Sequence, residues 1–458
     1  MFLEVVRSEG LAHLSYILGD GGKAAVIDPR RDWHVYIDIA YSNGAQISHI
    51  FETHRNEDYV IGSKELARHS GADIYHGSQL PFEYGTAVRE GDEFELGDVK
   101  LTVLETPGHT YESISIVLAD TGFSDKPLAV FTGDALFIGD VGRTDFFPDK
   151  AEEVAGLLYD SIFAKILPLG DHVILYPAHG AGSVCGSGMA SREFSTLGYE
   201  RAFNPALQVM DQNEFIRKKV NEHHYLPPYF KRMEEYNLKG APPLGGLPTP
   251  KPYGARQFAE AMEDGMTVLD VRSPEAFAAA FVPGSLAVPL DMLPAFAGYY
   301  LSYQHDIGLV VEKRQEVEIA TRYLTRLGYD KVVCYLEGGL TSWETSGYHY
   351  DSIPAVYAGE IKRRIEAGEE FTLLDVRTEQ EFKSKHLKKA VHVYVGDLPE
   401  RLDKVPGKRP ITTFCGSGQR AIIAASILKK SGFDLVEDCL GSMEACDAVG
   451  CPVASGDA

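Results

Sequence analysis

The sequence predicts a multidomain α/β protein in which helices cover sheets, and three observations lead to this prediction. The 458 residues are enough for about three domains. The first 120 residues read as short β runs separated by turn residues, whereas helical segments alternate with strands later in the chain. After residue 254 one strand–helix pattern occurs twice, which indicates repeated domains.

The first predicted domain, residues 1–238, is built mainly from β runs. We expect strands at 2–8, 14–20, 23–29, 94–106, 113–120, 128–137 and 172–180, and a helix at 149–167, where apolar residues recur at helical spacing. Residues 239–254 are rich in proline and glycine and are expected to form a linker.

The rest of the chain is predicted to hold two related domains, at residues 255–350 and 351–458. The segment "TVLDVRSPEAF" (267–277) matches "TLLDVRTEQEF" (372–382). Each copy later has a helix that ends in glycine and an aromatic residue, in "LTRLGYDKVV" and "LKKSGFDLVE". Strands that alternate with helices predict a small parallel α/β sheet in each copy.

The composition excludes several classes of protein. A formal net charge of −22 without a basic run opposes binding to nucleic acid. The start "MFLEVVRSEG" lacks the features of a signal peptide, and no run approaches the roughly 18 apolar residues of a membrane span. The 6 cysteines include no Cys-x-x-Cys pair. We therefore expect a cytoplasmic protein without a membrane partner.

A metal site is predicted from residues that follow successive β runs. His54 lies in "FETHRNEDY", His109 in "ETPGHT", Asp134 in "FTGDALF" and His179 in "YPAHGAG". A His-x-His-x-Asp-His loop would supply two metal ions, but Asn56 and Tyr59 stand at two of its histidine positions. Two histidines and one carboxylate leave open positions on an octahedral ion, as in non-haem Fe(II) oxygenases.

These stretches resemble the metallo-β-lactamase fold over about residues 1–235, and within it the persulfide dioxygenase family. The resemblance implies an αββα sandwich and one Fe(II) per N-terminal domain, held by His54, His109 and Asp134. It further implies that a thiol persulfide and O₂ react there to give sulfite and free thiol. Asp58 and His179 are then left to contact the substrate or the metal ligands.

Two further residues near this predicted site have open roles. Arg143, in "GDVGRTD", either faces an anionic substrate or holds its loop through a carboxylate. Cys185 follows His179 in a Gly-Ser loop and is either an inert thiol or a relay that passes sulfur on.

A second site is predicted around Cys415 in "TTFCGSGQRAIIAASILKKSG". Small residues after the cysteine let backbone N–H groups turn inward, and the following helix adds positive potential, so a thiolate or persulfide anion is favoured. Arg420 closes the loop after four intervening residues. The loop resembles that of rhodanese sulfurtransferases, and the resemblance implies that Cys415 is the nucleophile and Arg420 the anion clamp.

The first copy of the repeat is predicted to be inactive. Alignment on "LGYD" and "SGFD" places Val311 opposite Cys415 and Glu316 opposite Arg420. Valine cannot attack sulfur, and glutamate would repel an anion. The first copy therefore resembles a rhodanese-like domain kept for spacing, docking or oligomer contact, and we expect a homo-oligomer.

The whole chain resembles persulfide dioxygenase–rhodanese fusions, which implies sulfide detoxification. The expected partners are a low-molecular-weight thiol persulfide, O₂, sulfite and thiosulfate. The rhodanese step would interconvert persulfide plus sulfite and thiosulfate plus thiol. Two alternatives stay open at this point. One is a thioester hydrolase resembling glyoxalase II joined to a sulfurtransferase, and the other is a non-catalytic sulfur-binding scaffold.

Overall fold

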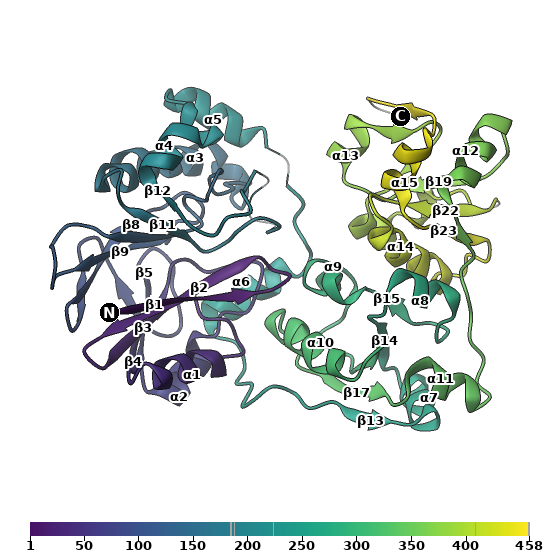
Figure 1. Ribbon diagram of the computed structural model, residues 1–458, viewed down its shortest axis with the longest axis horizontal. Coiled ribbons are helices and arrows are strands. Elements are labelled where there is room, and N and C mark those ends of the chain that lie inside the picture. The colour runs from purple at the N-terminus through teal and green to yellow at the C-terminus, as the bar shows by residue number, and fades with distance from the viewer. Residues whose placement is uncertain (184–185, 187, 223, 408, 457–458) are drawn as a thin grey trace. The chain divides into compact units, whose positions relative to one another are not determined.

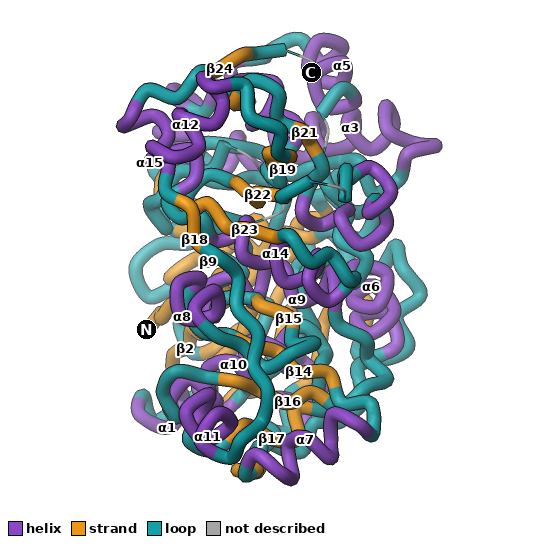
Figure 2. Tube along the Cα trace, turned by 90° about the vertical axis from the view of Figure 1, so that its right-hand side faces the viewer, coloured by secondary structure: helices purple, strands orange, loops and turns teal. Residues whose placement is uncertain are grey.

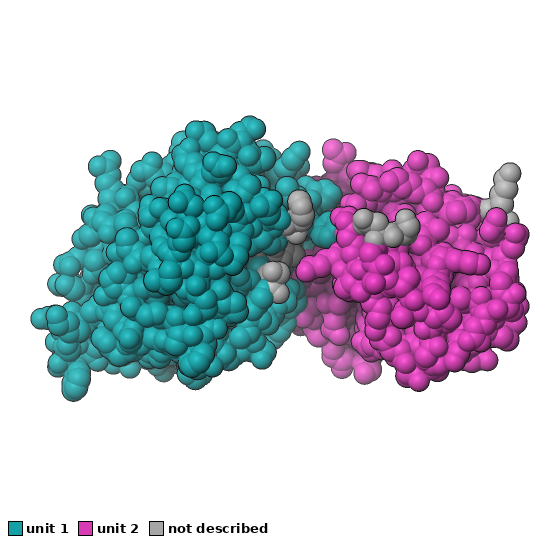
Figure 3. Space-filling view, turned by 90° about the horizontal axis from the view of Figure 1, so that it is seen from above, with its two compact units in different colours: residues 1–247, 325–328 teal, residues 248–324, 329–458 magenta. Residues whose placement is uncertain are grey.

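The computed structural model describes residues 1–183, 186, 188–222, 224–407 and 409–456 (Figure 1). The chain divides into two compact units, coloured in Figure 3. The first comprises Met1–Leu247 with Thr325–Gly328, and the second comprises Pro248–Leu324 with Tyr329–Ala458.

The described residues of the first unit form two six-stranded sheets. The first sheet runs in chain order through β1 (Phe2–Ser8), β2 (His13–Asp20), β3 (Lys23–Ile27), β4 (Gln46–Glu52), β5 (Asp73–Gly77) and β6 (Thr86–Val88). The second has the order β12 (Ser195–Thr196), β11 (Ile174–Pro177), β10 (Ala129–Gly133), β9 (Ile114–Asp120), β8 (Val99–Glu105) and β7 (Glu93–Leu96).

The core of this unit lies between the two sheets. Alternate residues of both sheets, among them Phe51, Leu101 and Phe131, form one buried cluster. Helices α1 (His34–Ser42) and α2 (Ser63–Ser70) pack on the outer face of the first sheet. The outer face of the second is covered by α3 (Ala151–Asp160), α4 (Leu197–Phe203) and α5 (Gln212–Val220). These four layers confirm the predicted αββα sandwich.

One further helix of the first unit, α6 (Phe230–Lys239), lies close to the end of β4. Asn237 on α6 receives the backbone N–H of Ile61 at 2.9 Å and donates to the carbonyl oxygens of Asn56 and Tyr59, each at 2.8 Å. Because Asn237 is fully buried, these bonds fix the loop that follows β4.

The second unit contains two five-stranded sheets with the same topology. The first has the order β13 (Lys251–Tyr253), β17 (Val332–Leu336), β16 (Ile307–Val310), β14 (Thr267–Asp270) and β15 (Leu286–Ala287). The second has the order β18 (Ala355–Val356), β23 (Val436–Cys439), β22 (Ile411–Phe414), β19 (Thr372–Asp375) and β21 (Val391–His392). Every neighbouring pair in both sheets is parallel, as predicted.

Helices surround the strands in each copy (Figure 2). The first copy has α7 (Ala255–Glu263), α8 (Pro274–Ala279), α9 (Leu293–Tyr300), α10 (Gln315–Arg326) and α11 (Gly339–Thr345). The second has α12 (Ala358–Ala367), α13 (Glu379–Ser384), α14 (Gln419–Lys430) and α15 (Ser442–Val449), with a small β20 (His386–Leu387) and β24 (Val453–Ala454) pair. Among the described residues, no helix combines the length and the apolar character needed to span a bilayer.

Several segments differ from the sequence-based boundaries. Residues 94–106, expected as one strand, form the antiparallel pair β7 and β8, because the chain turns between them. Residues 251–253, placed in the linker, form β13 because they pair with β17 and complete the edge of its sheet. The helix expected at 149–167 changes its winding after Asp160, where a π-helical turn (Ser161–Ile166) replaces the α-helix. Ile162 and Ile166 of that turn still face the core, so the hydrophobic pattern alone does not reveal the change.

Candidate metal centre and cysteine loop

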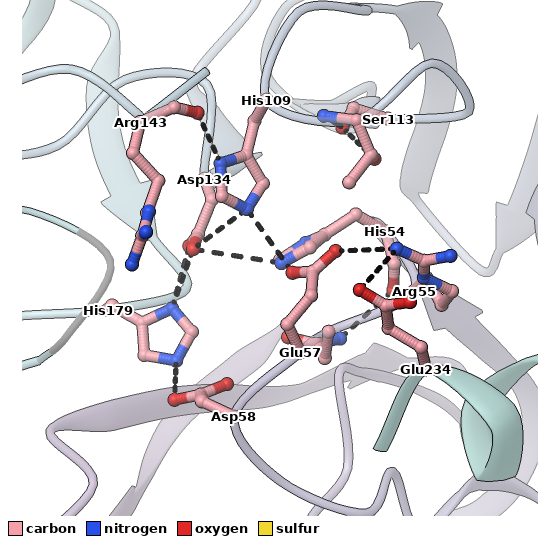
Figure 4. A network of polar contacts seen from close by, with 12 residues as sticks. His54, Arg55, Glu57, Asp58, His109, Ser113, Asp134, Arg143, His179 and Glu234 are labelled. Atoms are coloured by element: carbon pink, nitrogen blue, oxygen red, sulfur yellow. Dashed lines mark hydrogen bonds and ion pairs between the residues drawn. The ribbon is translucent and has the colours of Figure 1, made fainter. Parts of the chain in front are cut away.

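The predicted metal residues lie beyond the ends of strands that belong to both sheets of the first unit. His54 follows β4, His109 follows β8, Asp134 follows β10 and His179 follows β11. All four side chains are buried. Strand ends bring their loops to one edge of the sandwich, and Figure 4 shows the four side chains gathered there.

His54, His109 and Asp134 form a group that could hold a metal ion. Their ligand atoms lie within 4.8 Å of one another. The Oδ2 atom of Asp134 is 3.7 Å from His54 Nε2 and 3.5 Å from His109 Nε2. This donor set, two nitrogens and one carboxylate oxygen, suits a first-row divalent metal.

Hydrogen bonds on the far side of each ring orient the two histidines. His54 Nδ1 lies 2.9 Å from Thr53 Oγ1, whose hydroxyl donates to Asp28 Oδ2 at 2.7 Å. His109 Nδ1 lies 3.0 Å from the carbonyl oxygen of Arg143. Both acceptors require a protonated Nδ1, so in the neutral form of each ring Nε2 presents its lone pair to the site.

The free nitrogens are the strongest sign that a cation belongs here. Among the described residues, neither His54 Nε2 nor His109 Nε2 has a hydrogen-bond partner, although both are buried. Burial lowers the pKa of His54 to about 4, so its ring is neutral at pH 7. A neutral imidazole with an unpartnered nitrogen is the form that ligates a metal, so the residues fit the ion.

Asp58 and His179 lie behind Asp134. His179 Nδ1 is 2.7 Å from Asp134 Oδ1, and its Nε2 is 3.1 Å from Asp58 Oδ2. Burial would raise the pKa of Asp134, but His179 and His54 outweigh it and hold that pKa well below its usual range. The chain from Asp58 through His179 therefore keeps Asp134 ionised and oriented.

The two substituted positions in the loop serve the fold. Asn56 adopts a φ of 55°, which asparagine tolerates, and its Nδ2 donates to the carbonyl oxygen of His54 at 3.0 Å. The hydroxyl of Tyr59 is 2.8 Å from His13 Nε2. Neither contact supplies the imidazole ligands of a second metal ion.

Arg143 binds a carboxylate of its own loop, which is the contact that one of its two predicted roles requires. Its Nε and Nη2 atoms bind Asp145 at 2.6 and 2.7 Å, and its guanidinium lies over the ring of Phe146. Its carbonyl oxygen also orients His109. Cys185 lies outside the described residues.

Sequence reasoning missed several groups of this site. Thr53, Asp28 and the Arg143 carbonyl act on the far sides of the histidines, and no spacing rule locates such partners. Glu57 was also missed, although it lies three residues after His54. Burial would raise the pKa of Glu57, but His109 and Arg55 lower it to about 2. The only feature of the sequence that could have indicated a buried charge at Glu57 is the oppositely charged Arg55, two residues before it.

In the second unit, Cys415 directly follows β22, the central strand of its sheet. Its side chain is buried, and Sγ receives the backbone N–H of Gly418 at 3.1 Å. Gly418 has a φ of 110°, which a residue with a Cβ rarely adopts. The backbone N–H of Cys415 donates to Ser442 Oγ at 3.0 Å, which ties the loop to α15. The loop thus points an N–H group at the sulfur.

Arg420 lies in the first turn of α14, beside this loop. Its Nη1 and Nη2 atoms bind the carboxylate of Glu381 on α13, each at 2.7 Å. Glu381 also belongs to the capping box of α13 with Thr378. The guanidinium is therefore held by two hydrogen bonds before any substrate arrives.

Comparisons with known proteins agree with this division of the chain. The metallo-beta-lactamase superfamily matches residues 9–179, and the rhodanese-like domain matches residues 254–346 and 357–448. Mitochondrial persulfide dioxygenase ETHE1 of Mus musculus is 31% identical over 211 residues, which cover 44% of this chain and 74% of the mouse protein. Hydroxyacylglutathione hydrolase GloC of Haemophilus influenzae is 27% identical over 217 residues, which cover 42% of this chain and 91% of GloC.

One solved structure extends this similarity further along the chain. A metallo-beta-lactamase from Staphylococcus aureus subsp. aureus COL is 32% identical with a TM-score of 0.66. The match covers 73% of this chain and 98% of the staphylococcal chain.

Proposed function

Because the chain belongs to the persulfide dioxygenase family of the metallo-beta-lactamase superfamily and carries two rhodanese-like domains, we propose that it oxidises a thiol persulfide and transfers persulfide sulfur. A persulfide anion, O₂ and one water would give a thiol and hydrogensulfite. The cysteine loop would join persulfide sulfur to that sulfite. One Fe(II) per N-terminal domain is the proposed cofactor.

The single observation that supports the first step is a group of three candidate ligands beside a loop that lacks two histidines of a second metal site. Asn56 and Tyr59 stand at those two positions. His54 offers a neutral nitrogen, His109 offers an Nε2 atom without a hydrogen-bond partner among the described residues, and Asp134 offers an ionised carboxylate. When bound, iron would supply the redox chemistry that O₂ requires. The protein's own share is to fix both imidazoles from behind and to keep Asp134 charged through His179.

The second step would use the Cys415 thiolate. Its sulfur attacks the outer sulfur of the persulfide, and the S–S bond of the donor breaks to release a thiol. Sulfite then attacks the outer sulfur of the Cys415 persulfide, so that thiosulfate leaves and the thiolate returns. The N–H of Gly418 is placed to stabilise the anion at each stage.

Metal analysis of anaerobically purified protein, with O₂ uptake on several thiol persulfides, tests this proposal. We expect one iron per chain and persulfide-dependent O₂ uptake. His109→Ala should lose both the iron and the O₂ uptake. The similarity to GloC makes thioester hydrolysis the competing function. Two tightly held zinc ions per chain with thioesterase activity would contradict the dioxygenase proposal.

A further inference from the structure

Glu57 shares the buried surroundings of the three metal ligands. It lies in the loop after β4 and is fully buried. Its Oε2 atom is 3.6 Å from His109 Nε2, close to the 3.5 Å that separates the same nitrogen from Asp134 Oδ2. Figure 4 shows the Glu57 carboxylate beside the facing ends of His54 and His109.

Within the described residues, one oxygen of this carboxylate accepts a hydrogen bond and the other does not. Glu57 Oε1 accepts a hydrogen bond from Arg55 Nη2 at 3.2 Å, and Arg55 also pairs with Glu234 on α6 at 3.3 Å. Among the described residues, Glu57 Oε2 has no hydrogen-bond partner. A buried carboxylate oxygen without a partner is costly, so a cation or a donor should face it in the working protein.

Two ring nitrogens of the same cluster also lack hydrogen-bond partners among the described residues. They are the Nε2 atoms of His54 and His109. Three unpartnered donor atoms of one buried loop cluster therefore surround the place where the ion would lie. A single divalent cation would compensate all of them.

We propose that Glu57 is a fourth residue of the metal centre, which holds the divalent ion through its negative charge from outside the group of three ligands. This inference rests on the proposed metal site. Glu57 would also partly neutralise the ion, while Arg55 balances the carboxylate on its other side. Removal of such a partner typically weakens metal binding about 10- to 100-fold.

The test measures metal affinity of the apo full-length protein by anaerobic competition between Fe(II) and a chelator. Glu57→Gln should bind Fe(II) about 10- to 100-fold more weakly than wild type. Glu52→Gln is the matched control, because Glu52 is equally buried but the Tyr84 hydroxyl lies 3.0 Å from both of its oxygens. This control should keep the wild-type affinity.

Thermal unfolding of the apo proteins separates this role from a merely structural one. Glu57→Gln keeps a side-chain oxygen that can accept the Arg55 hydrogen bond, so its apo form should lose little stability compared with wild type. A second variant, Arg55→Met, removes the competing cation, and its metal affinity should equal or exceed that of wild type.

Wild-type affinity in Glu57→Gln together with a less stable apo form would overturn the inference, because Glu57 would then serve only Arg55. Equal weakening in Arg55→Met and Glu57→Gln would overturn it as well, since loss of the pair alone would explain both. The same comparison with Co(II) or Zn(II) decides the role of Glu57 even if the protein shows no O₂ uptake, so the two proposals fail separately.

Discussion

The two rhodanese-like copies share a frame and differ in the loop at its centre. Both sheets have the same strand order. Asp270 binds Arg272 as Asp375 binds Arg377, with Nη2 to Oδ2 distances of 2.6 Å in both pairs. Because the copy with Val311 in place of the loop cysteine keeps this pair, the Asp-Val-Arg segment supports the fold rather than sulfur chemistry.

The backbone N–H groups of the two loops bind different side chains. In the second copy, the Gly418 N–H points at the sulfur of Cys415. In the first copy, the N–H groups of Glu312 and Lys313 donate to Glu316 Oε2 at 2.9 and 3.1 Å. The first loop therefore holds a carboxylate of its own where the second would hold a sulfur anion. If the first copy is inactive as predicted, the internal carboxylate of Glu316 contributes to this as well as the lost nucleophile.

The partner of the arginine is also lost in the first copy. Alignment of the Asp-Val-Arg segments places Ala276 opposite Glu381, so neither half of the Arg420–Glu381 pair is present. A cavity of about 500 Å³ opens there, lined by Ala276, Val311, Gly338 and their neighbours. The two loops therefore differ at three positions that act together. These are the positions of Cys415, Arg420 and Glu381 in the second copy.

The largest effect that would sharpen this comparison is expected from Cys415→Ser. The hydroxyl is a far weaker nucleophile, so sulfur transfer should fall on the order of 10³-fold or more, whereas O₂ uptake should persist. The product should change from thiosulfate to sulfite, as chromatography of thiol-labelled mixtures would show. His109→Ala is the converse control, and it should keep transfer from thiosulfate to cyanide. Loss of O₂ uptake in Cys415→Ser would mean that the sites are not separable.

The next largest effect is expected from Arg420→Met. Loss of the guanidinium should reduce sulfur transfer about 10²-fold, because an electrostatic contact to the transferring anion is removed. It also leaves Glu381 without its partner, so the variant should unfold at a lower temperature. Adding Glu381→Gln should restore the unfolding temperature but not the transfer. Recovery of both would show that Arg420 acts only as a partner of Glu381.

A smaller effect is expected when the first loop is rebuilt in a Cys415→Ser background. Val311→Cys alone should give no transfer from thiosulfate to cyanide above that background, because Glu316 still fills the loop. Val311→Cys combined with Glu316→Arg and Ala276→Glu should raise transfer measurably. Activity in the single variant would break the comparison, since the nucleophile would then be the only difference that matters.

The sequence predicts the frame of both regions better than their fine contacts. The repeated strand–helix alternation predicts the two parallel sheets, and the resemblance to the metallo-β-lactamase fold implies the αββα sandwich. Both are confirmed. The alignment on "LGYD" and "SGFD" matches the structure, because Val311 follows β16 as Cys415 follows β22. The roles of the site residues stay predictions, although the structure gathers His54, His109 and Asp134.

The contacts that could not be predicted from the sequence are those that depend on the direction in which a loop turns. The carbonyl of Arg143 reaches His109 because the loop after β10 turns back. Glu316 reaches two backbone N–H groups from the first turn of α10. Such contacts depend on backbone orientation, which periodicity and spacing do not specify.

The smallest expected effect concerns how the first rhodanese-like copy supports the second. Residues 421–428 of α14 are buried all around the helix, which a single sheet cannot achieve. The first copy supplies the other cover: its Ala287 N–H donates to Ser426 Oγ at 3.1 Å, and its Tyr300 hydroxyl donates to the Val395 carbonyl at 2.8 Å.

Removal of these bonds should therefore loosen the helix that carries Arg420. Ser426→Ala leaves the buried Ala287 N–H without an acceptor, so the free energy of unfolding should fall by about 1–3 kcal/mol. Tyr300→Phe removes one half-buried bond and should cost about 1 kcal/mol. Denaturant unfolding of the full chain measures both, and Tyr41→Phe, at an exposed position, is the control. If contact with the first copy maintains the loop, sulfur transfer by Ser426→Ala should decline at a lower temperature than in wild type, while O₂ uptake should not. A parallel decline of both activities would show that the first copy supports the whole chain rather than the Cys415 loop.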